Sequence, residues 1–337
     1  MRIGVGIVLF VDLIIRSLSI KAFFTDEGVL PIDILKQYNW SPNYFSFHAL
    51  SGDLWLQIVL FLVNALCIIL LTVGYRARVF TLICWVFLTS IQNRNPFILQ
   101  GGDDMLRLLL FWAIFLPWGE RYSIQKKSSY SNCYFGWANI GYILLPCSVF
   151  FFSAMLKTST EWQTEGTALY YALSLDQIRM PFGTFIYQFP NLLKVLTHLV
   201  FYTELLAPLL IVLPFVSTKI RIVGIIASVT LYIGIASTLY IGLFYIIGIV
   251  SLIGLLPSHV IDWFEKHFYK NNTLYTEIEY QSNSSFIIAF IKISKNYFLI
   301  FIASFCLMMN LGSIKKFPYG LDPVIVNYGK MLRLEQN

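Results

Sequence analysis

Long runs of hydrophobic residues alternate with short polar segments along most of the chain. An α-helix rises about 1.5 Å per residue, so about 20 hydrophobic residues cross the hydrocarbon core of a bilayer. The pattern predicts about nine membrane-spanning helices, over residues 3–21, 54–74, 78–95, 104–119, 136–156, 192–216, 219–238, 240–256 and 286–311. We therefore expect an all-α integral membrane protein, a polytopic bundle that forms a single domain over residues 1–337.

Residues 22–53 interrupt this pattern between the first two predicted helices. Within them, residues 31–53 mix aromatic with polar side chains and are too polar to span a bilayer. Amphipathic segments of this kind lie in the plane of the membrane interface. We expect residues 22–53 to form an outer interfacial segment that contains an amphipathic helical hairpin.

Composition agrees with a membrane location. Hydrophobic residues make up 57% of the chain and charged residues only 12%, whereas about a quarter of the residues in a soluble domain are charged. The net charge of +6 comes from Lys and Arg residues that are never clustered beyond two neighbours. This distribution argues against nucleic-acid binding and is typical of loops that meet anionic lipid.

The distribution of basic residues predicts the orientation of the helices, because Lys and Arg in short loops are retained in the cytoplasm. Four loops carry such residues on one side of the predicted bundle: Arg76 and Arg78; Arg121, Lys126 and Lys127; Lys219 and Arg221; Lys266 and Lys270. The N-terminus is then inside and the C-terminus outside. The outer segments are the richer in Pro, Gly, Asn and acidic residues, so we expect a functional site at the extracytoplasmic face.

One pair of charged residues lies within the first predicted helix, and ionisable groups inside apolar helices are usually paired or functional. Asp12 and Arg16 are spaced i, i+4 and lie on one helix face. We interpret them as a structural ion pair; the alternative is a pair that holds the outer site in place.

A glycine-rich turn precedes the fourth predicted helix. Asp103 and Asp104 follow two glycines there, and one of the two acids is expected to be the helix N-cap. Arg107 is placed to pair with either acid, or with an acid on another helix. The segment is thus a capped turn or a functional polar cluster.

Lys157 and Glu204 are the most informative ionisable residues. Lys157 ends a long apolar run, where it either reaches for the membrane surface or acts as a base with a lowered pKa. Glu161, one turn later, is a candidate to neutralise it. Glu204 lies inside a predicted helix, so it is a partnered acid, a proton carrier or a substrate contact. Cysteine spacing supports no metal site.

Three stretches resemble one known family when taken in order. They are MRIGVGIVLFVDLIIRSLSIKAFFTDEGVLP, GYRARVFTLICWVFLTSIQNRNPFILQGGDD and LKTSTEWQTEGTALYYALSLD. They resemble the horizontally transferred transmembrane (HTTM) domain family, which is related to vitamin K-dependent gamma-carboxylase. The resemblance implies nine helices and an extracytoplasmic active face. The base of the carboxylase, a lysine five residues before a tryptophan, matches Lys157, and the tryptophan matches Trp162.

The chain also departs from the carboxylase. Two histidines of that enzyme correspond to Gly102 and Tyr232, and its large extracytoplasmic domain has no counterpart, which argues against carboxylation itself. Family members usually extend beyond both ends of this chain, so the resemblance implies a domain or a reduced member.

The sequence therefore leads to a hypothesis with two alternatives. The preferred function is a carboxylase-like enzyme, a lyase or oxidoreductase of the bacterial plasma membrane, that acts on a quinol-like, lipid-soluble or secreted peptide substrate, with a quinone or quinol as candidate cofactor. Lys157 is the candidate base, and the surrounding candidates are Glu161, Trp162, Tyr170, Asp103, Asp104, Arg107 and Glu204. One alternative is a non-enzymatic maturation or export partner of a secreted peptide, similar to the membrane proteins that mature sporulation-delaying peptides. The other is a transporter that couples protons through Glu204.

Overall fold

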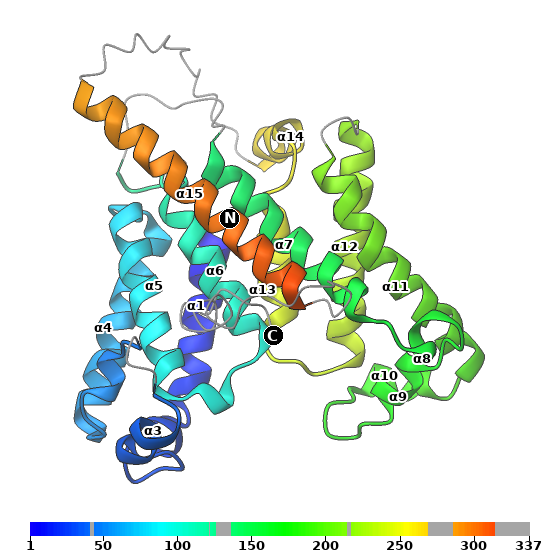
Figure 1. The fold of residues 1–337 in the computed structure, drawn as a ribbon, viewed down its shortest axis with the longest axis horizontal. Coiled ribbons are helices and arrows are strands. Elements are labelled where there is room, and N and C mark those ends of the chain that lie inside the picture. The colour runs from blue at the N-terminus through cyan, green and yellow to red at the C-terminus, as the bar shows by residue number, and fades with distance from the viewer. Residues whose placement is uncertain (41–43, 121, 126–135, 214–216, 269–285, 314–337) are drawn as a thin grey trace. The chain divides into compact units, whose positions relative to one another are not determined.

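The structure is a computed structural model that describes residues 1–40, 44–120, 122–125, 136–213, 217–268 and 286–313. Within these ranges the chain is helical, and its extended pairing is limited to one isolated β-bridge between Arg179 and Leu239. The chain divides into two compact units, Met1–Tyr142 with Leu274–Asn337 as unit 1, and Ile143–Thr273 as unit 2 (Figure 1). A single domain over the whole chain stays a prediction.

Unit 1 is built on four helices that pack on one another in the order in which they occur along the chain. Its elements are α1 (Arg2–Ser17), α2 (Ile20–Phe24), α3 (Ile32–Tyr38), η1 (Phe47–Ala49), α4 (Leu54–Val73), α5 (Ala77–Arg94), η2 (Pro96–Ile98), α6 (Gly101–Ile114) and α15 (Phe286–Ser313). Helix α1 packs on α4, α4 on α5, and α5 on α6. At Gly6 the approach of α1 to α4 is so close that a Cβ would lie 2.0 Å from the Thr72 hydroxyl oxygen.

Unit 2 is centred on the pair formed by α11 and α12. Helix α7 (Trp137–Leu156) carries the chain across the boundary between the units, and α8 (Thr160–Gln163), α9 (Ala168–Leu173), α10 (Pro181–Tyr187), α11 (Pro190–Val212), α12 (Thr218–Thr238), α13 (Phe244–Ile253) and α14 (Ser258–Phe268) follow. Helices α8, α9 and α10 pack on α11, and α12 packs on α11 and α13. Gly224 allows the close approach of α12 to α11, because a Cβ there would lie 3.0 Å from the Ala207 carbonyl oxygen.

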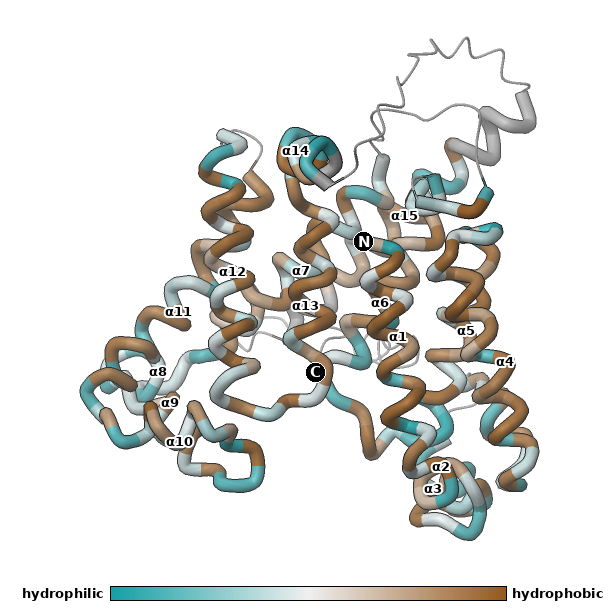
Figure 2. Tube along the Cα trace, turned by 180° about the vertical axis from the view of Figure 1, so that it is seen from behind, coloured by the Kyte–Doolittle hydropathy of each residue, from teal (hydrophilic) through white to brown (hydrophobic). Residues whose placement is uncertain are grey.

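Several helices are suited to a bilayer. Among the described residues, four are long and apolar enough to cross one: α4, α7, α11 and α12. A fifth span is possible if α13 and the start of α14, which meet at a 97° bend, count as one. Hydrophobic residues run along most of the length of these helices in Figure 2. An all-helical fold with four or five such helices is therefore present, and nine spans stay a prediction.

Some predicted helices differ in length from those observed. The helix predicted over residues 3–21 is divided into α1 and α2, and the one predicted over 104–119 is α6, which has 14 residues. The predicted hairpin over residues 31–53 has one α-helix, α3, and a 3-10 turn, η1. Residues 41–43 of that segment lie outside the described ranges.

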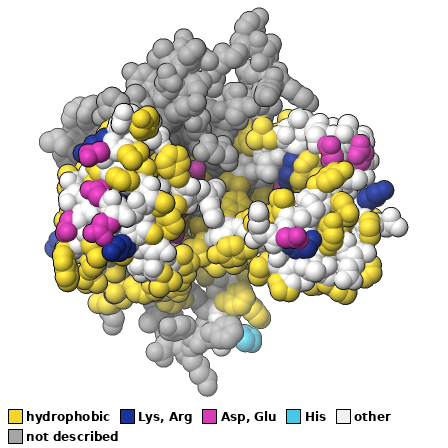
Figure 3. Space-filling view, turned by 90° about the horizontal axis from the view of Figure 1, so that it is seen from below, with side chains coloured by type: hydrophobic (Ala, Val, Ile, Leu, Met, Phe, Trp, Pro, Cys, Tyr) yellow, Lys and Arg dark blue, Asp and Glu magenta, His cyan; other side chains and the backbone are white. Residues whose placement is uncertain are grey.

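The outer segment predicted over residues 22–53 is bonded to the end of α5 rather than resting on the unit as a separate layer. Asn93 and Arg94 donate hydrogen bonds to the carbonyl oxygens of Phe45 and Leu30, at 2.9 and 2.8 Å. Figure 3 shows charged side chains among hydrophobic ones in the part of each unit that faces the viewer. The hydrogen bonds of Asn93 and Arg94 explain how a segment too polar to span a membrane is held on a hydrophobic unit.

Candidate functional site

Lys157 is the first residue after α7. The helix ends at Leu156, and the Lys157 amide still donates to the Ala154 carbonyl oxygen at 3.1 Å. The next amide, of Thr158, turns back to the Leu156 carbonyl oxygen at 2.9 Å, so the chain leaves the helix axis at once. The side chain is thereby placed beside the helix end, with 15% of its surface exposed.

The partner of Lys157 is Glu204. The ammonium donates a hydrogen bond to the Glu204 carboxylate and forms an ion pair with it, although the two residues are 47 positions apart. Glu204 belongs to α11, one of the helices long enough to span a membrane, and only 7% of its side chain is exposed. A carboxylate in such a place is costly without a partner, and the lysine supplies one.

Trp162 also contacts the ammonium. The short helix α8 places its indole ring so that Lys157 Nζ lies 4.3 Å from the ring centroid. A cation over an indole face is attracted by the negative charge of the π system. Gln163 Nε2 also donates to the Lys157 carbonyl oxygen at 3.2 Å, which ties α8 to the end of α7.

Two other predicted residues of this group lie in different environments. The Glu161 carboxylate has a hydrogen bond with Ser159, which lowers the pKa of Glu161. The carboxylate that pairs with Lys157 belongs to Glu204 instead of Glu161. Tyr170, in α9, stacks on Tyr187 with ring centroids 4.8 Å apart.

A glycine explains how α8 and α9 lie so close to α11. Gly166 has a φ of +68°, and a Cβ there would lie 2.9 Å from His198 Nε2 and 3.0 Å from the Lys194 carbonyl oxygen. A residue with a side chain is strained by the backbone conformation and blocked by α11. The turn at Gly166 therefore sets the position of the segment that carries Trp162.

Burial and the ion pair shift the pKa of Lys157 in opposite directions. Burial lowers the pKa of Lys157 by disfavouring its charged form, and the Glu204 carboxylate raises it, with burial the larger effect. A lysine with a lowered pKa gives up its proton more readily than an exposed one.

Tyr232 adds a polar group that the sequence named only as a departure from the carboxylase. Its side chain is fully buried, its ring centroid lies 4.8 Å from that of Phe150, and it rests so close to α13 that a Cβ at Gly248 would lie 2.1 Å from the ring. The hydroxyl has no hydrogen-bond partner among the described residues, and Glu204 interacts with it electrostatically.

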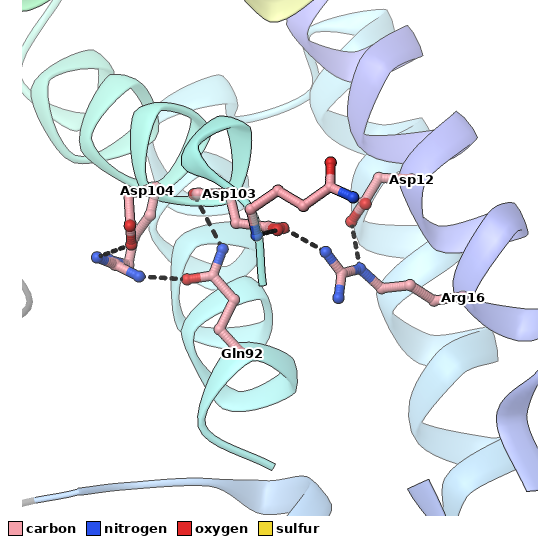
Figure 4. Close-up of polar contacts among 7 residues, drawn as sticks. Asp12, Arg16, Gln92, Asp103 and Asp104 are labelled. Carbon is pink, nitrogen blue, oxygen red and sulfur yellow. Dashed lines mark hydrogen bonds and ion pairs between the residues drawn. The ribbon is translucent and has the colours of Figure 1, made fainter. Parts of the chain in front are cut away.

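A second charged cluster occupies unit 1. Arg16 donates from Nε to Asp12 at 2.8 Å and from Nη2 to Asp103, so one guanidinium on α1 joins two carboxylates (Figure 4). The i, i+4 pair inferred from the sequence is present, and Asp103 of α6 completes it. All three side chains are nearly buried.

The cluster continues along α6 to α5. Arg107 forms an ion pair with Asp104 at 2.7 Å and donates to Gln92 Oε1 at 2.5 Å, while Gln92 Nε2 donates to the Asp103 carbonyl oxygen at 3.0 Å. The N-cap of α6 is Gln100, rather than one of the acids as predicted. Asp103 instead accepts from the Gln100 amide at 2.8 Å, which is the reciprocal bond of a capping box.

The two clusters differ in what chemistry they allow. In the unit 1 cluster, Arg16 and Arg107 each pair with a carboxylate, and arginine keeps its proton throughout the physiological range. Lys157 has one carboxylate, an aromatic ring and a transferable proton. The candidate site is therefore Lys157 with Glu204 and Trp162, and Asp12, Arg16, Asp103, Asp104 and Arg107 belong to a separate cluster in the other unit.

The described residues contain no group of three or more His, Cys, Asp or Glu side chains arranged to hold a metal ion. The described cysteines are free thiols, and Cys133 lies outside the described ranges. Compared with models of protein families, with curated proteins and with solved structures, the chain gives no match.

Proposed function

We propose that the protein is an HTTM-type integral membrane protein in which Lys157 takes a proton from a lipid-soluble, quinol-like substrate. The observation that carries the proposal is the nearly buried ion pair of Lys157 with Glu204, capped by the Trp162 ring. It brings together a titratable amine, a carboxylate able to neutralise it and an aromatic surface.

The proposed step is a proton transfer. The resting ammonium of Lys157 first releases a proton to water, and the neutral amine then accepts the proton of a substrate hydroxyl, which leaves an oxyanion on the substrate and an ammonium on the lysine. The Glu204 carboxylate stabilises that ammonium, as it does in the resting pair. A positioned base of this kind contributes about 10²- to 10⁴-fold in rate.

The membrane environment suits such a substrate. Glu204 lies in α11 and Lys157 directly follows α7, and both helices are apolar enough to cross a bilayer. A quinol reaches a site of this kind from the lipid phase. With nine spans and an inner N-terminus, Lys157 lies at the extracytoplasmic end of its helix.

The test is a comparison of Lys157→Ala with Lys194→Ala, an exposed lysine of the same unit. The purified protein, in lipid nanodiscs, is given a reduced naphthoquinone, and quinol consumption and oxygen uptake are followed. We expect Lys157→Ala to lose about 100-fold or more in rate and Lys194→Ala to retain the native rate. A folded Lys157→Ala variant with the native rate would exclude the proposed base.

The same preparation separates the alternatives. A peptide that co-purifies with the native protein, without turnover of the quinol, would favour the maturation or export partner. Solute uptake into proteoliposomes that depends on pH and is lost in Glu204→Gln would favour the transporter.

A further inference from the structure

The C-terminal end of α5, in unit 1, has a buried arginine that uses only part of its hydrogen-bonding capacity. Arg94 is fully buried, and Nη1 donates to the Leu30 carbonyl oxygen at 2.8 Å. Its Nε and Nη2 atoms have no hydrogen-bond partner among the described residues. The N–H groups of Nε and Nη2 point the same way along one edge of the guanidinium, which is the edge that grips a carboxylate or phosphate with two parallel hydrogen bonds.

The nearest carboxylate does not fill this edge. Asp26 Oδ1 lies 3.7 Å from Arg94 Nη2, beyond hydrogen-bond distance, and is engaged by the Ile32 amide at 2.8 Å. Asp26 is also held by Gly52, since its amide donates to the Gly52 carbonyl oxygen at 3.1 Å and a Cβ at Gly52 would lie 1.9 Å from Asp26 Cγ. The carboxylate is therefore kept at a distance from Arg94, and 52% of the Asp26 side chain is exposed.

A second unpartnered polar atom belongs to His48, which is also fully buried. Its Nδ1 lies 2.7 Å from the Ser90 hydroxyl oxygen, and Ser90 is on the same face of α5 as Arg94. The hydrogen of Ser46 is used toward the Ser90 carbonyl oxygen at 2.6 Å, so the Ser90 hydroxyl is free to donate to Nδ1. In that arrangement the neutral imidazole carries its proton on Nε2, as a donor without an acceptor.

The charge on His48 agrees with this assignment. Burial, and secondarily the charge of Arg94, lower the pKa of His48 to about 3, so the ring is neutral at physiological pH. Ser90, which bonds His48 Nδ1, lies four residues before Arg94 in α5, so His48 and Arg94 lie at the same face of that helix. The buried end of α5 thus has a guanidinium that lies 3.7 Å from the Asp26 carboxylate, and three nitrogen atoms, on Arg94 and His48, without hydrogen-bond partners among the described residues.

We propose that unit 1 binds a small oxyanion, a carboxylate or a phosphate, along the Nε–Nη2 edge of Arg94, with His48 Nε2 as an additional donor. The anion balances the buried guanidinium charge, which Asp26 approaches without a hydrogen bond. Its source is either a free anion or the phosphate of a lipid headgroup, because the chemistry recognised is the same. This site lies outside the Lys157 site and does not depend on the function proposed for it.

The experiment measures the melting temperature of the full chain in lipid-free detergent, because a ligand of the folded state raises it with concentration. Sodium phosphate and sodium acetate are titrated against sodium chloride at equal ionic strength. In a second arm dioleoylphosphatidylglycerol is titrated against dioleoylglycerol, which lacks the phosphate. A response to the free anions identifies a soluble ligand, and a response to the phosphatidylglycerol alone identifies a lipid headgroup.

Variants then locate the effect. Arg94→Lys keeps the charge and loses the two-pronged edge, so the apparent affinity falls at least about tenfold. Arg78→Lys, on the exposed surface of the same helix, leaves it unchanged. Asp26→Asn removes the competing carboxylate while retaining the oxygen that accepts from Ile32, so the anion binds several-fold more tightly.

The Asp26→Asn arm keeps the proposal testable if Arg94→Lys fails to fold. Unchanged or weaker binding by Asp26→Asn would overturn the site. An equal rise in melting temperature for the Arg94→Lys and Arg78→Lys variants would also overturn it. If none of the three probes raises the melting temperature of the native protein, buried water alone meets these donors and the site is excluded.

Discussion

Each unit of this protein buries an ion pair between helices, and the two pairs have opposite properties. In unit 1, Arg16 is bonded to Asp12 and Asp103. Asp103 also accepts the hydrogen bond that caps α6 and one from Gln92 of α5. In unit 2, Lys157 is bonded to Glu204 and lies against the face of a tryptophan. The first is a network with several anchors, and the second is an isolated pair.

The contrast shows that the type of cation decides what a buried pair can do. A guanidinium holds several fixed hydrogen bonds and does not release its proton, so the unit 1 network connects helices. An ammonium has a lower intrinsic affinity for its proton and shifts its pKa readily on burial. Stability is therefore expected to depend most on the first pair, and proton transfer on the second.

The largest effect is expected from Arg16→Met. It leaves two nearly buried carboxylates without their cation, and loss of one partner of a buried pair costs about 3–5 kcal/mol in the free energy of unfolding. Denaturant unfolding in detergent measures it. The control is Lys21→Met, which removes an exposed pair with Glu27 and is expected to change the stability little, because solvent screens exposed pairs. Equal losses in the two variants would show that the network does not stabilise unit 1.

The Lys157→Arg variant separates charge from proton transfer. Arginine retains the ion pair with Glu204, so the protein stays folded, but the guanidinium cannot act as a base. We expect a loss of about 100-fold in quinol consumption, or about 2.7 kcal/mol in the activation free energy. An active Lys157→Arg variant would mean that the site needs a positive charge and not a proton acceptor.

Gly166→Ala tests the turn that brings α8 to Lys157. The positive φ and the contact with His198 predict a loss of about 1–3 kcal/mol in the free energy of unfolding. Gly234→Ala is the matched control, because a Cβ at this position in α12 meets nothing within 4 Å and alanine favours a helix by about 0.5–1 kcal/mol. If Gly166→Ala has the stability of the native protein, Gly166 does not constrain the segment.

The smallest effect is a dependence of stability on pH. Burial lowers the pKa of Lys157 from its ordinary value of 10.5, so between the folded-state pKa and 10.5 the unfolded chain binds more protons. Stability then rises with pH across that window, by at most about 1.4 kcal/mol per pH unit. Unfolding at a series of pH values checks this, and the slope should be smaller in Lys157→Met. A slope that Lys157→Met leaves unaltered would assign it to other groups.

The local part of the unit 1 cluster could be predicted from the sequence. Asp12 with Arg16 and Asp104 with Arg107 are four and three residues apart, and helical geometry alone places such residues on one face. The N-cap of α6 was predicted one turn too late, because glutamine is a weaker cap signal than aspartate. The turn itself, with its two glycines and two acids, was recognised.

The long-range part was not predictable in the same way. The sequence offers the nearby Glu161 as the candidate to neutralise Lys157, whereas the observed partner is Glu204. A buried lysine and a buried glutamate in one chain could have suggested this pairing by charge balance. For Arg94 and His48 the sequence carried no comparable signal.

The sequence by itself determined that this protein is hydrophobic and helical, where its apolar helices run, and which charges share one turn of a helix. These properties depend on composition and on the fixed period of the helix. Only the tertiary structure decided that Glu204 meets Lys157, that Asp103 meets Arg16, and that one edge of Arg94 is open. Such contacts depend on how each helix is rotated and shifted against its neighbours. The packing of the whole unit determines this, and it cannot be read from a local sequence pattern.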